Sequence, residues 1–546
     1  MTATVAPSAD HEVRNSHRFN GIGDLLRLYL RLDRVRITVW TLALALTVYA
    51  TVESLIAAYP DEAARQARAA LLENPAAVLM TGPAYGADNY TLGAMTANEL
   101  SLTLFVAVAI MNILLVVRHT RAQEEAGRLE LLRALPVGPF APPAAALLSV
   151  AVADLIVGGG VVLALLAGGL DFTGSLLFGV ATAVTGLLFG AVAAVTAQFS
   201  EHSRAASGSA LAVLAVAFLV RGFGDIIEAT GSWVSWLSPI AWAQQTRLYV
   251  DERWWPLLLS VVAIGVLLAV AVALSRRRDI GAGLRAPKPG PATSSSALLT
   301  PPGPVWRLLR GTFVAWTVAL AIIGLAMGTL ANSIEDMVDS VPDIVEFLGA
   351  DAQSLTASFG ATMLMFLVVG IAAFAVSAVI RVRGDEEAGR LGLLIVTGTP
   401  RNRLFLWAIA VIVAQVVVAL VITGAATGLG MAAATGEVDW IIRMCGAALA
   451  YAPAVLFALA VALALVGFVP RLAGLAWILV VYAVFVAWFG ELLNLSQWLR
   501  DLSPFSHISL VPYESASAVP MLVLGIAAVV LAAAAVVGFR RRDVTV

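Results

Sequence analysis

The sequence contains a single cysteine and a single lysine among its 546 residues. One cysteine, Cys445, excludes an intrachain disulfide framework and any zinc or iron–sulfur site that needs several cysteines. The lysine, Lys288, lies in the segment Ala-Pro-Lys-Pro-Gly and does not follow a glycine-rich loop. Because a P-loop needs a lysine at that place to reach the β- and γ-phosphates of a nucleotide, the chain has no Walker-type ATPase of its own. If ATP drives this protein, a partner subunit must hydrolyse it.

Charge is scarce as well. Charged residues make up 13% of the chain and hydrophobic residues 60%, whereas soluble proteins are usually about 25% charged. This composition excludes a soluble enzyme, a disordered chain and a fibrous protein, and it predicts an all-α, polytopic membrane protein. Twelve stretches reach the roughly 20 mostly apolar residues that a membrane helix needs. They are residues 37–57, 98–117, 142–169, 173–197, 205–223, 255–275, 310–331, 357–380, 403–431, 441–468, 472–492 and 516–539.

The distribution of basic residues orients these spans. Twelve spans place both termini on one side, and the positive-inside rule puts that side in the cytoplasm, because 27 of the 34 basic residues then lie inside. The preference for arginine over lysine is typical of a GC-rich bacterial genome. We therefore expect a multi-pass protein of a bacterial inner (plasma) membrane with both termini cytoplasmic. The seven outer basic residues are Arg65, Arg68, Arg221, Arg247, Arg253, Arg443 and Arg500.

Short motifs recur in the same order in the two halves of the chain. The segment Glu-Glu-Ala-Gly-Arg-Leu at residues 124–129 recurs at 386–391, and Arg-Arg-Arg-Asp at 276–279 recurs at 540–543. These pairs indicate a duplicated six-helix unit. Three shorter pairs keep the same order: Val39-Trp40-Thr41 with Ala315-Trp316-Thr317, Phe223-Gly224-Asp225 with Phe489-Gly490-Glu491, and Leu237-Ser238-Pro239 with Leu502-Ser503-Pro504.

The repeat sets the predicted domain organisation. An even number of spans points both copies the same way through the membrane, so residues 37–279 and 305–546 form two parallel six-helix repeats. Residues 280–304, rich in proline, glycine and serine, link them in the cytoplasm. Residues 1–36 form a cytoplasmic N-terminal segment with an amphipathic helix over 22–36 that lies in the membrane interface or serves only as a topology anchor.

The repeated Glu-Glu-Ala-Gly-Arg segment is the strongest candidate for a functional site. The predicted topology places it on the cytoplasmic side, between the second and third spans of each half. We expect a short amphipathic helix at about 121–133 and another at about 384–396, with acidic residues at the start and basic residues at the end, as the helix dipole favours. Its exposed carboxylates and guanidinium suit an interface that docks specifically. A solvated turn whose charges serve only topology does not explain why both copies keep the same charges.

The pattern Glu-Glu-x-Gly-Arg-Leu-x-Leu-Leu, followed by Pro136 or Pro400, resembles the coupling-helix signature of ABC-2 type permeases, the membrane subunits of ATP-driven exporters of the type V kind. The resemblance covers essentially the whole chain. The duplicated twelve-span form is most similar to permeases of the tetronasin or polyketide-antibiotic export type. The resemblance implies that two copies of a separate ABC ATPase subunit dock on the two predicted short helices. The residues implied in this coupling are Glu124, Glu125, Gly127 and Arg128 in the first half, and Glu386, Glu387, Gly389 and Arg390 in the second.

The same resemblance places the second and fifth spans of each half along a substrate route. Their side chains are mostly large and apolar, so a hydrophobic or amphipathic small molecule is the expected substrate. Packing against lipid or within the core is the alternative for any one of them. The candidates are Phe105, Met111, Asn112, Phe218, Met363, Phe366, Tyr482 and Phe485.

Two outer features are less specific. Residues 222–251 and 490–514 carry tryptophans and are too broken to span a bilayer, which predicts re-entrant or interfacial helices. The outer loop 332–357 is acidic but lacks the ligand pattern of a calcium loop, so a solvated acidic face is favoured over a cation site.

These patterns together predict the transmembrane permease subunit of an ATP-driven ABC exporter, which moves antibiotics or drugs out of the cell by alternating access. The chain would not be an enzyme by itself and would bind no cofactor, metal or nucleic acid, because ATP and Mg belong to the partner subunit. The alternative is a proton-coupled drug transporter of the major-facilitator type, which has the same six-plus-six arrangement and needs no partner. The long first outer loop and the shortage of ionisable residues within the spans, where Asp154 stands almost alone, favour the exporter.

Overall fold

The computed structural model describes residues 18–70, 72, 78, 81–83, 85–228, 231–285, 292–300, 302–331, 352–387, 389, 400–489 and 495–542. Within these residues every regular element is a helix, which confirms the all-α prediction. Twelve helices among them are long and apolar enough to cross a membrane, the number expected from the sequence. The chain divides into two units, Met1–Pro289 and Gly290–Val546, and this division falls inside the predicted linker 280–304.

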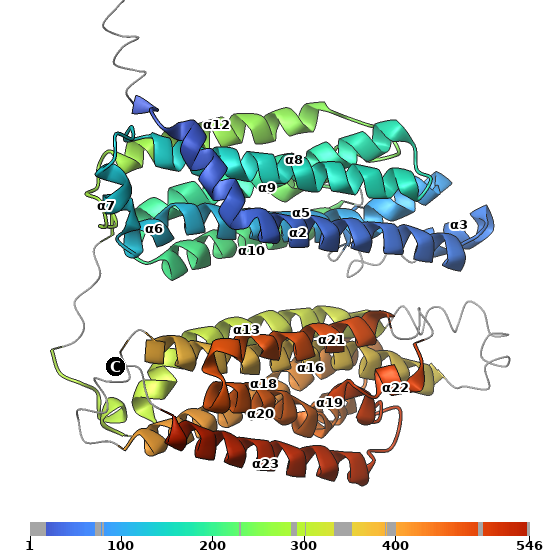
Figure 1. The fold of residues 1–546 in the computed structure, drawn as a ribbon. Coiled ribbons are helices and arrows are strands. Elements are labelled where there is room, and N and C mark those ends of the chain that lie inside the picture. The colour runs from blue at the N-terminus through green and yellow to red at the C-terminus, as the bar shows by residue number, and fades with distance from the viewer. Residues whose placement is uncertain are drawn as a thin grey trace, which may run out of the picture. The chain divides into compact units, whose positions relative to one another are not determined.

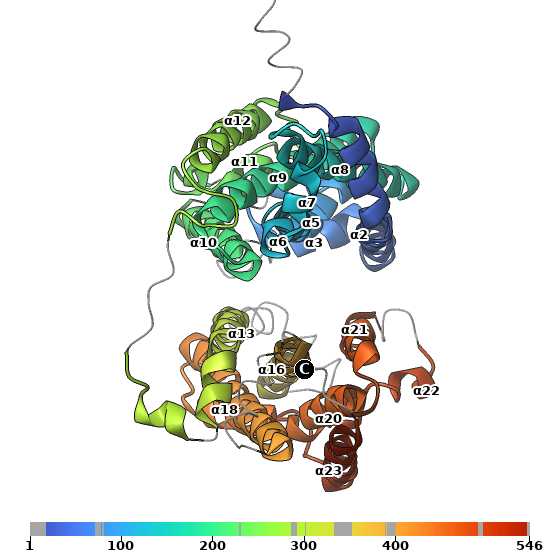
Figure 2. The ribbon, with the colours of Figure 1, turned by 60° about the vertical axis from the view of Figure 1, so that its left-hand side comes forward.

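The first unit is a bundle of six long helices (Figure 1). Helices α5 and α9 are largely buried, whereas α12 keeps most of its apolar surface exposed at the rim of the bundle (Figure 2), as expected for a helix that faces lipid. Glycine allows α8 and α9 to touch: a Cβ at Gly179 would lie 2.7 Å from the carbonyl oxygen of Gly158. The six helices are α2 (Ile22–Ala58), α5 (Leu92–His119), α8 (Ala141–Ala167), α9 (Phe172–Phe199), α10 (Ser203–Ile227) and α12 (Trp255–Ser275).

The second unit repeats this order with two interruptions. Its fourth span is broken into two helices at Tyr451. Pro453 lies in the first turn of the second helix, and because proline has no backbone N–H it cannot continue the hydrogen bonding of the helix before it. Its fifth span begins with a 3₁₀ segment, η5 (Pro470–Leu475). The helices are α13 (Gly303–Thr329), α16 (Ala352–Glu387), α18 (Arg401–Thr435), α19 (Asp439–Ala450), α20 (Ala452–Phe468), α21 (Ala476–Phe489) and α23 (Ala518–Arg541).

The first span and the predicted interfacial helix are a single element. Helix α2 runs without a break from Ile22 to Ala58, so no change of secondary structure marks the boundary predicted at residue 36. No proline or glycine occurs between Asp24 and Ala58 to end the helix. Figure 1 shows its ribbon bending part-way along. The basic side chains of its first turns remain exposed, as predicted.

Short helices occupy the predicted outer end of each unit. In the first unit these are η3 (Ser235–Leu237) and α11 (Pro239–Gln244), and in the second α22 (Gln497–Arg500) and η6 (Pro504–His507). The repeated Leu-Ser-Pro motif marks a helix start in both units, because its serine is the N-cap residue and its proline occupies the first turn. These elements are too short to span a bilayer, as expected.

Candidate functional site

The Glu-Glu-Ala-Gly-Arg segment breaks at its glycine. Gly127 has φ +67° and Gly389 has φ +70°, the left-handed conformation that commonly ends a helix. The expected helix over residues 121–133 is therefore two short helices, α6 (Arg121–Glu125) and α7 (Arg128–Arg133). In the second unit α16 continues to Glu387. Most of the predicted helix over 384–396, and Arg390 with it, lies outside the described residues.

The first glutamate of the motif is bound within its own unit. Both carboxylate oxygens of Glu124 accept hydrogen bonds from Arg278, at 2.7 and 2.8 Å, just beyond the end of α12. Arg121 Nη1 also donates to Glu124 Oε2 at 2.6 Å. We call Arg121, Glu124 and Arg278 the first bracket. All three side chains are at least 89% buried.

The second unit contains the same arrangement. Arg542 donates to Glu386 Oε2 at 2.5 Å, and Arg383 lies 3.6 Å from the same oxygen. We call Arg383, Glu386 and Arg542 the second bracket. Glu386 is only 3% exposed. The expectation that Glu124 and Glu386 are exposed docking carboxylates is therefore wrong, because each is enclosed by two arginines of the same unit.

The brackets contain residues that the sequence reasoning missed. Arg121 and Arg383 each lie three residues before their glutamate, and Arg278 and Arg542 were noted only as part of a repeated Arg-Arg-Arg-Asp motif. A signal was present, since all three members recur in both halves at nearly the same offset. The two strongest repeats of the chain thus contact each other in space within each unit.

The second glutamate of each motif is more accessible. Glu125 is 41% exposed and accepts hydrogen bonds from the backbone nitrogen and the hydroxyl of Ser203, at the start of α10. Glu387 is 60% exposed and pairs with Arg383 at 2.7 Å. Arg128 lies on the surface of α7. Among the described members of the candidate set, the accessible side chains are therefore these three.

An exposed apolar surface accompanies them in the first unit. Leu131 is 72% exposed and Leu135 is 56% exposed, beside exposed Glu130. The other side of α7 packs inward, where Leu132 contacts a buried cluster that includes Leu25 of α2. The segment around α7 therefore presents one mixed apolar and charged surface, which the sequence reasoning did not single out.

The first turns of α2 are tied to the same end of the unit. Asp33 is buried beside the end of α5, where its carboxylate contacts His119 Nε2 and lies 3.2 Å from Arg118 and 3.2 Å from Arg36. The ring of Tyr29 stacks on His119 with centroids 4.4 Å apart. The start of α2, the end of α5 and the α6–α7 segment therefore form one connected layer.

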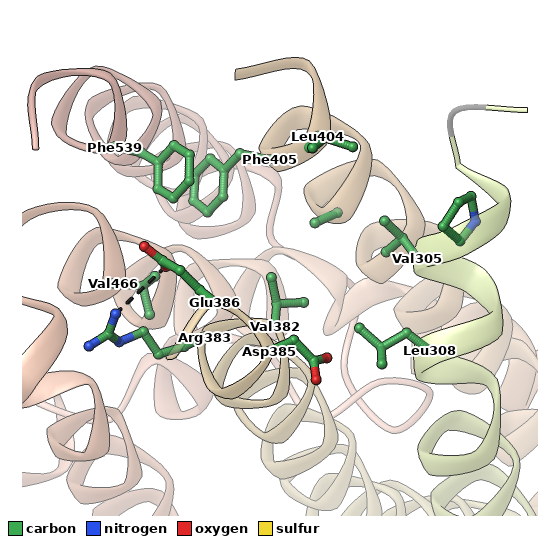
Figure 3. A pocket seen from close by; sticks show the side chains of 12 residues that line it. Val305, Leu308, Val382, Arg383, Asp385, Glu386, Leu404, Phe405, Val466 and Phe539 are labelled. Carbon is green, nitrogen blue, oxygen red and sulfur yellow. Dashed lines mark ion pairs between the residues drawn. The ribbon is translucent and has the colours of Figure 1, made fainter. Parts of the chain in front are cut away.

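A cavity lies beside each bracket. In the second unit a cavity of about 160 Å³ is lined by apolar side chains, with Arg383, Asp385 and Glu386 on its wall (Figure 3). In the first unit a cavity of about 270 Å³ is lined by Glu124 and Arg278 together with residues of α8, α9 and α12. The bracket is thus part of the wall of a hollow in both units.

The expected substrate-route residues fall into two groups. Phe105, Met111 and Asn112 are fully buried within the first unit. Met111 nevertheless lines a groove of about 420 Å³ between α2 and α5, together with Trp40 and Arg36. The remaining five are not fully buried: Phe218, Met363, Phe366, Tyr482 and Phe485.

Asn112 has a specific partner inside the membrane span. Its side-chain nitrogen donates to Asp154 Oδ1 at 2.7 Å, and both residues are fully buried. Gly186 of α9 makes room for the pair, because a Cβ there would lie 2.1 Å from the Asn112 nitrogen. Asn112 thus joins α5 to α8. Among the described residues no group of three or more His, Cys, Asp or Glu side chains is placed to hold a metal ion.

Known proteins resemble this chain along its full length. A family model described as multidrug efflux system permease Rv1217c, C-terminal domain, matches residues 298–540. The chain is 39% identical to the multidrug efflux system permease protein Rv1217c of Mycobacterium tuberculosis (strain ATCC 25618 / H37Rv), over 100% of both chains. These matches support a multidrug efflux permease and not the tetronasin-specific type that the sequence pattern suggested.

Proposed function

The chain belongs to the family of the multidrug efflux system permease Rv1217c, and on that premise we propose that it is the membrane subunit of an ATP-driven ABC exporter. A separate ABC ATPase supplies the energy, because the chain has no P-loop lysine. Two copies of that ATPase bind the cytoplasmic ends of the two units. The protein expels hydrophobic or amphipathic drugs by alternating access, from a plasma membrane in which both termini are cytoplasmic.

The observation that carries this proposal is the repeated motif between the second and third spans. In both units it ends a helix at a left-handed glycine and holds its first glutamate between two arginines. Such a pre-organised element at one end of each six-helix unit suits a partner that binds twice. A major-facilitator transporter needs no partner and gives no reason for two such elements.

We place the docking surface on α7 and its neighbours in the first unit. Leu131 and Leu135 supply exposed apolar area, while Glu125, Arg128 and Glu130 supply charge around it. An apolar centre with a charged rim is the usual composition of a specific protein interface. In the second unit the corresponding accessible residue is Glu387.

The groove between α2 and α5 supports an amphipathic substrate. Its walls are apolar, and Arg36 and Arg118 lie at one end. Such a site would accept a molecule with a large apolar body and one polar group.

Co-expression with the ATPase encoded beside this chain tests the proposal. The full chain should co-purify with that ATPase, and inside-out vesicles should accumulate an amphipathic dye such as ethidium only when ATP is present. Leu131→Asp should abolish co-purification, whereas Leu299→Asp, at a similarly exposed leucine outside the spans, should leave co-purification intact. Dye transport driven by a proton gradient, without any ATPase, would contradict the proposal.

A further inference from the structure

The two brackets join elements that the proposed mechanism requires to move together. We propose that each bracket is a positioning device that carries the displacement of the docked cytoplasmic segment to the sixth span of the same unit. This inference rests on the proposed function, since it assigns a role to the bracket during ATP-driven transport. Glu124 and Glu386 are the central residues, and their role is to hold the sixth span, not to touch the ATPase.

The contacts of Glu124 fix both distance and orientation. Arg278 binds the two carboxylate oxygens with two separate nitrogens, and a bidentate pair of this kind is stronger and more directional than a single contact. Arg278 lies three residues beyond Ser275, where α12 ends, and its Nε donates to Gln198 Oε1 of α9 at 2.8 Å. A shift of α6 therefore acts directly on the ends of α12 and α9.

Arg121 extends the connection to the backbone. Its guanidinium donates to the carbonyl oxygens of Gly281 at 2.7 Å, Ala282 at 3.1 Å and Glu201 at 3.0 Å. The first two oxygens belong to the segment that follows α12, and the third lies between α9 and α10. Because the side chain is completely buried, these bonds have no competition from water. The ends of α5, α9 and α12 thus form one body around Glu124.

The second unit reaches the same result with different supports. The guanidinium of Arg542 lies over the ring of Phe539, 4.7 Å from its centroid, near the end of α23. That ring stacks on Phe405 of α18 with centroids 4.3 Å apart. In the first unit the arginine that follows the last span is supported by a polar side chain, Gln198. In the second unit the corresponding arginine is supported by aromatic rings. Only the two arginines and the glutamate are common to both, which assigns the shared task to the ion pairs themselves.

The first test reverses the charge of a bracket arginine and, as a control, that of the arginine next to it in the sequence. Arg278→Glu and Arg542→Glu place a carboxylate against the bracket glutamate, whereas Arg277→Glu and Arg541→Glu change the same charge at the adjacent exposed positions. The bracket variants should still co-purify with the ATPase and hydrolyse ATP. Dye transported per ATP should fall at least about tenfold, because the introduced carboxylate breaks the buried ion pair that constrains the sixth span. The neighbouring variants should keep the parental ratio.

Covalent replacement of the ion pair gives the second test. In a Cys445→Ser background the chain has no other cysteine, so Glu124→Cys and Arg278→Cys can be joined by a short bifunctional maleimide. Before cross-linking, this double variant should transport little dye per ATP. After cross-linking, transport per ATP should return to at least about half of the parental value, because the link replaces the constraint that the ion pair supplied. A residue that only aids folding would not respond to a cross-link made after the protein has folded.

The outcomes separate the two proposals. Equal transport per ATP in the uncross-linked double variant and its parent would overturn the bracket. So would a cross-link that abolishes transport, since the bracket would then have to open in each cycle. Loss of the double variant from the membrane in both states would mark the bracket as a folding element and would also overturn the inference. The proposed function fails instead if the Cys445→Ser parent itself transports without ATP.

Discussion

The two units hold the same ion-pair bracket inside differently built bundles. The first unit adds three buried polar ties: Asp33 with His119 and Arg118, Asn112 with Asp154, and Arg221 with Asp225. The offset that relates Glu124 to Glu386 relates Asn112 to Phe374, and it relates His119 to Arg381, which donates to Thr312 of α13 at 3.1 Å, so the residues that make these ties differ between the units. Duplication has therefore kept the bracket while the packing around it diverged.

This difference indicates where each unit obtains its rigidity. A buried polar pair orients its helices more specifically than apolar packing does, and removing one partner leaves an unsatisfied group. Near its bracket, the described part of the second unit has aromatic contacts such as the stacked rings of Phe405 and Phe539. We expect substitutions in the polar ties to affect the first unit strongly and their counterparts in the second unit weakly.

The largest expected effect comes from the buried pair near the C-terminal end of α10. Arg221 is fully buried, lies 3.2 Å from Asp225, and has its guanidinium over the ring of Phe218. Arg221→Leu would strand the Asp225 carboxylate, and it should lower the free energy of unfolding by about 3–5 kcal/mol. Ala487 occupies the related position in the second unit, so Ala487→Leu is the matched control and should have a much smaller effect.

Thermal unfolding in detergent, followed for both variants, measures this contrast. Ser235 also donates to Asp225 at 2.6 Å, and Asp225→Asn would keep that bond while removing the charge. It should therefore also be destabilising, because it leaves the buried Arg221 guanidinium without a counter-charge. Equal melting temperatures for Arg221→Leu and Ala487→Leu would show that the buried pair contributes nothing to the difference between the units.

A smaller effect is expected where Gly186 faces the Asn112–Asp154 pair. A Cβ at this position would lie 2.1 Å from the Asn112 nitrogen and 2.7 Å from Asp154 Oδ1. Gly186→Ala should cost about 1–3 kcal/mol through overpacking and displacement of the pair. Gly190→Ala, one turn further along α9, is the control, because the nearest atom to its Cβ would be 3.5 Å away. A melting temperature for Gly186→Ala no lower than for Gly190→Ala would contradict this geometry.

The same residues show what the sequence could and could not predict. Spans are recognisable because an unbroken run of about 20 apolar residues is typical of a membrane helix and rare in soluble folds, so their number and positions agree with the structure. The break at Gly127 was predictable in principle, because a glycine between a polar and an apolar segment often ends a helix. The periodicity of the apolar residues favoured one continuous helix, and that prediction was wrong.

The bracket could not be predicted in the same way. Its distant arginines, Arg278 and Arg542, lie 154 and 156 residues from their glutamates, and no local pattern indicates which charge meets which. Both glutamates of the motif look equally polar in the sequence. Only the contact of the segment after α12 with the segment after α5 separates Glu124, enclosed by arginines, from Glu125 at the surface.

Substitution of the motif glycines should lower the stability of the two units equally. Gly127 and Gly389 have positive φ values, and an added Cβ would meet no atom within 4 Å in either case. Gly127→Ala and Gly389→Ala should therefore each cost about 1 kcal/mol from backbone conformation alone. Unfolding free energies of the two variants that differ by more than this amount would show that the motif is not equivalent in the two units.

The smallest effect is expected at the exposed glutamates. Glu387 is 60% exposed and its pair with Arg383 is a surface contact, which usually contributes no more than about 1 kcal/mol. Glu387→Gln should therefore leave the melting temperature nearly unchanged, whereas Glu386→Gln, one residue earlier, removes the carboxylate that holds both Arg383 and Arg542.

Glu125→Gln and Glu124→Gln repeat the comparison in the first unit. Because Glu125 also caps the start of α10 through Ser203, its substitution should be the more costly of the two exposed changes. If Glu387→Gln destabilised the protein as much as Glu386→Gln, the division between an enclosed and an accessible glutamate would not hold in the second unit.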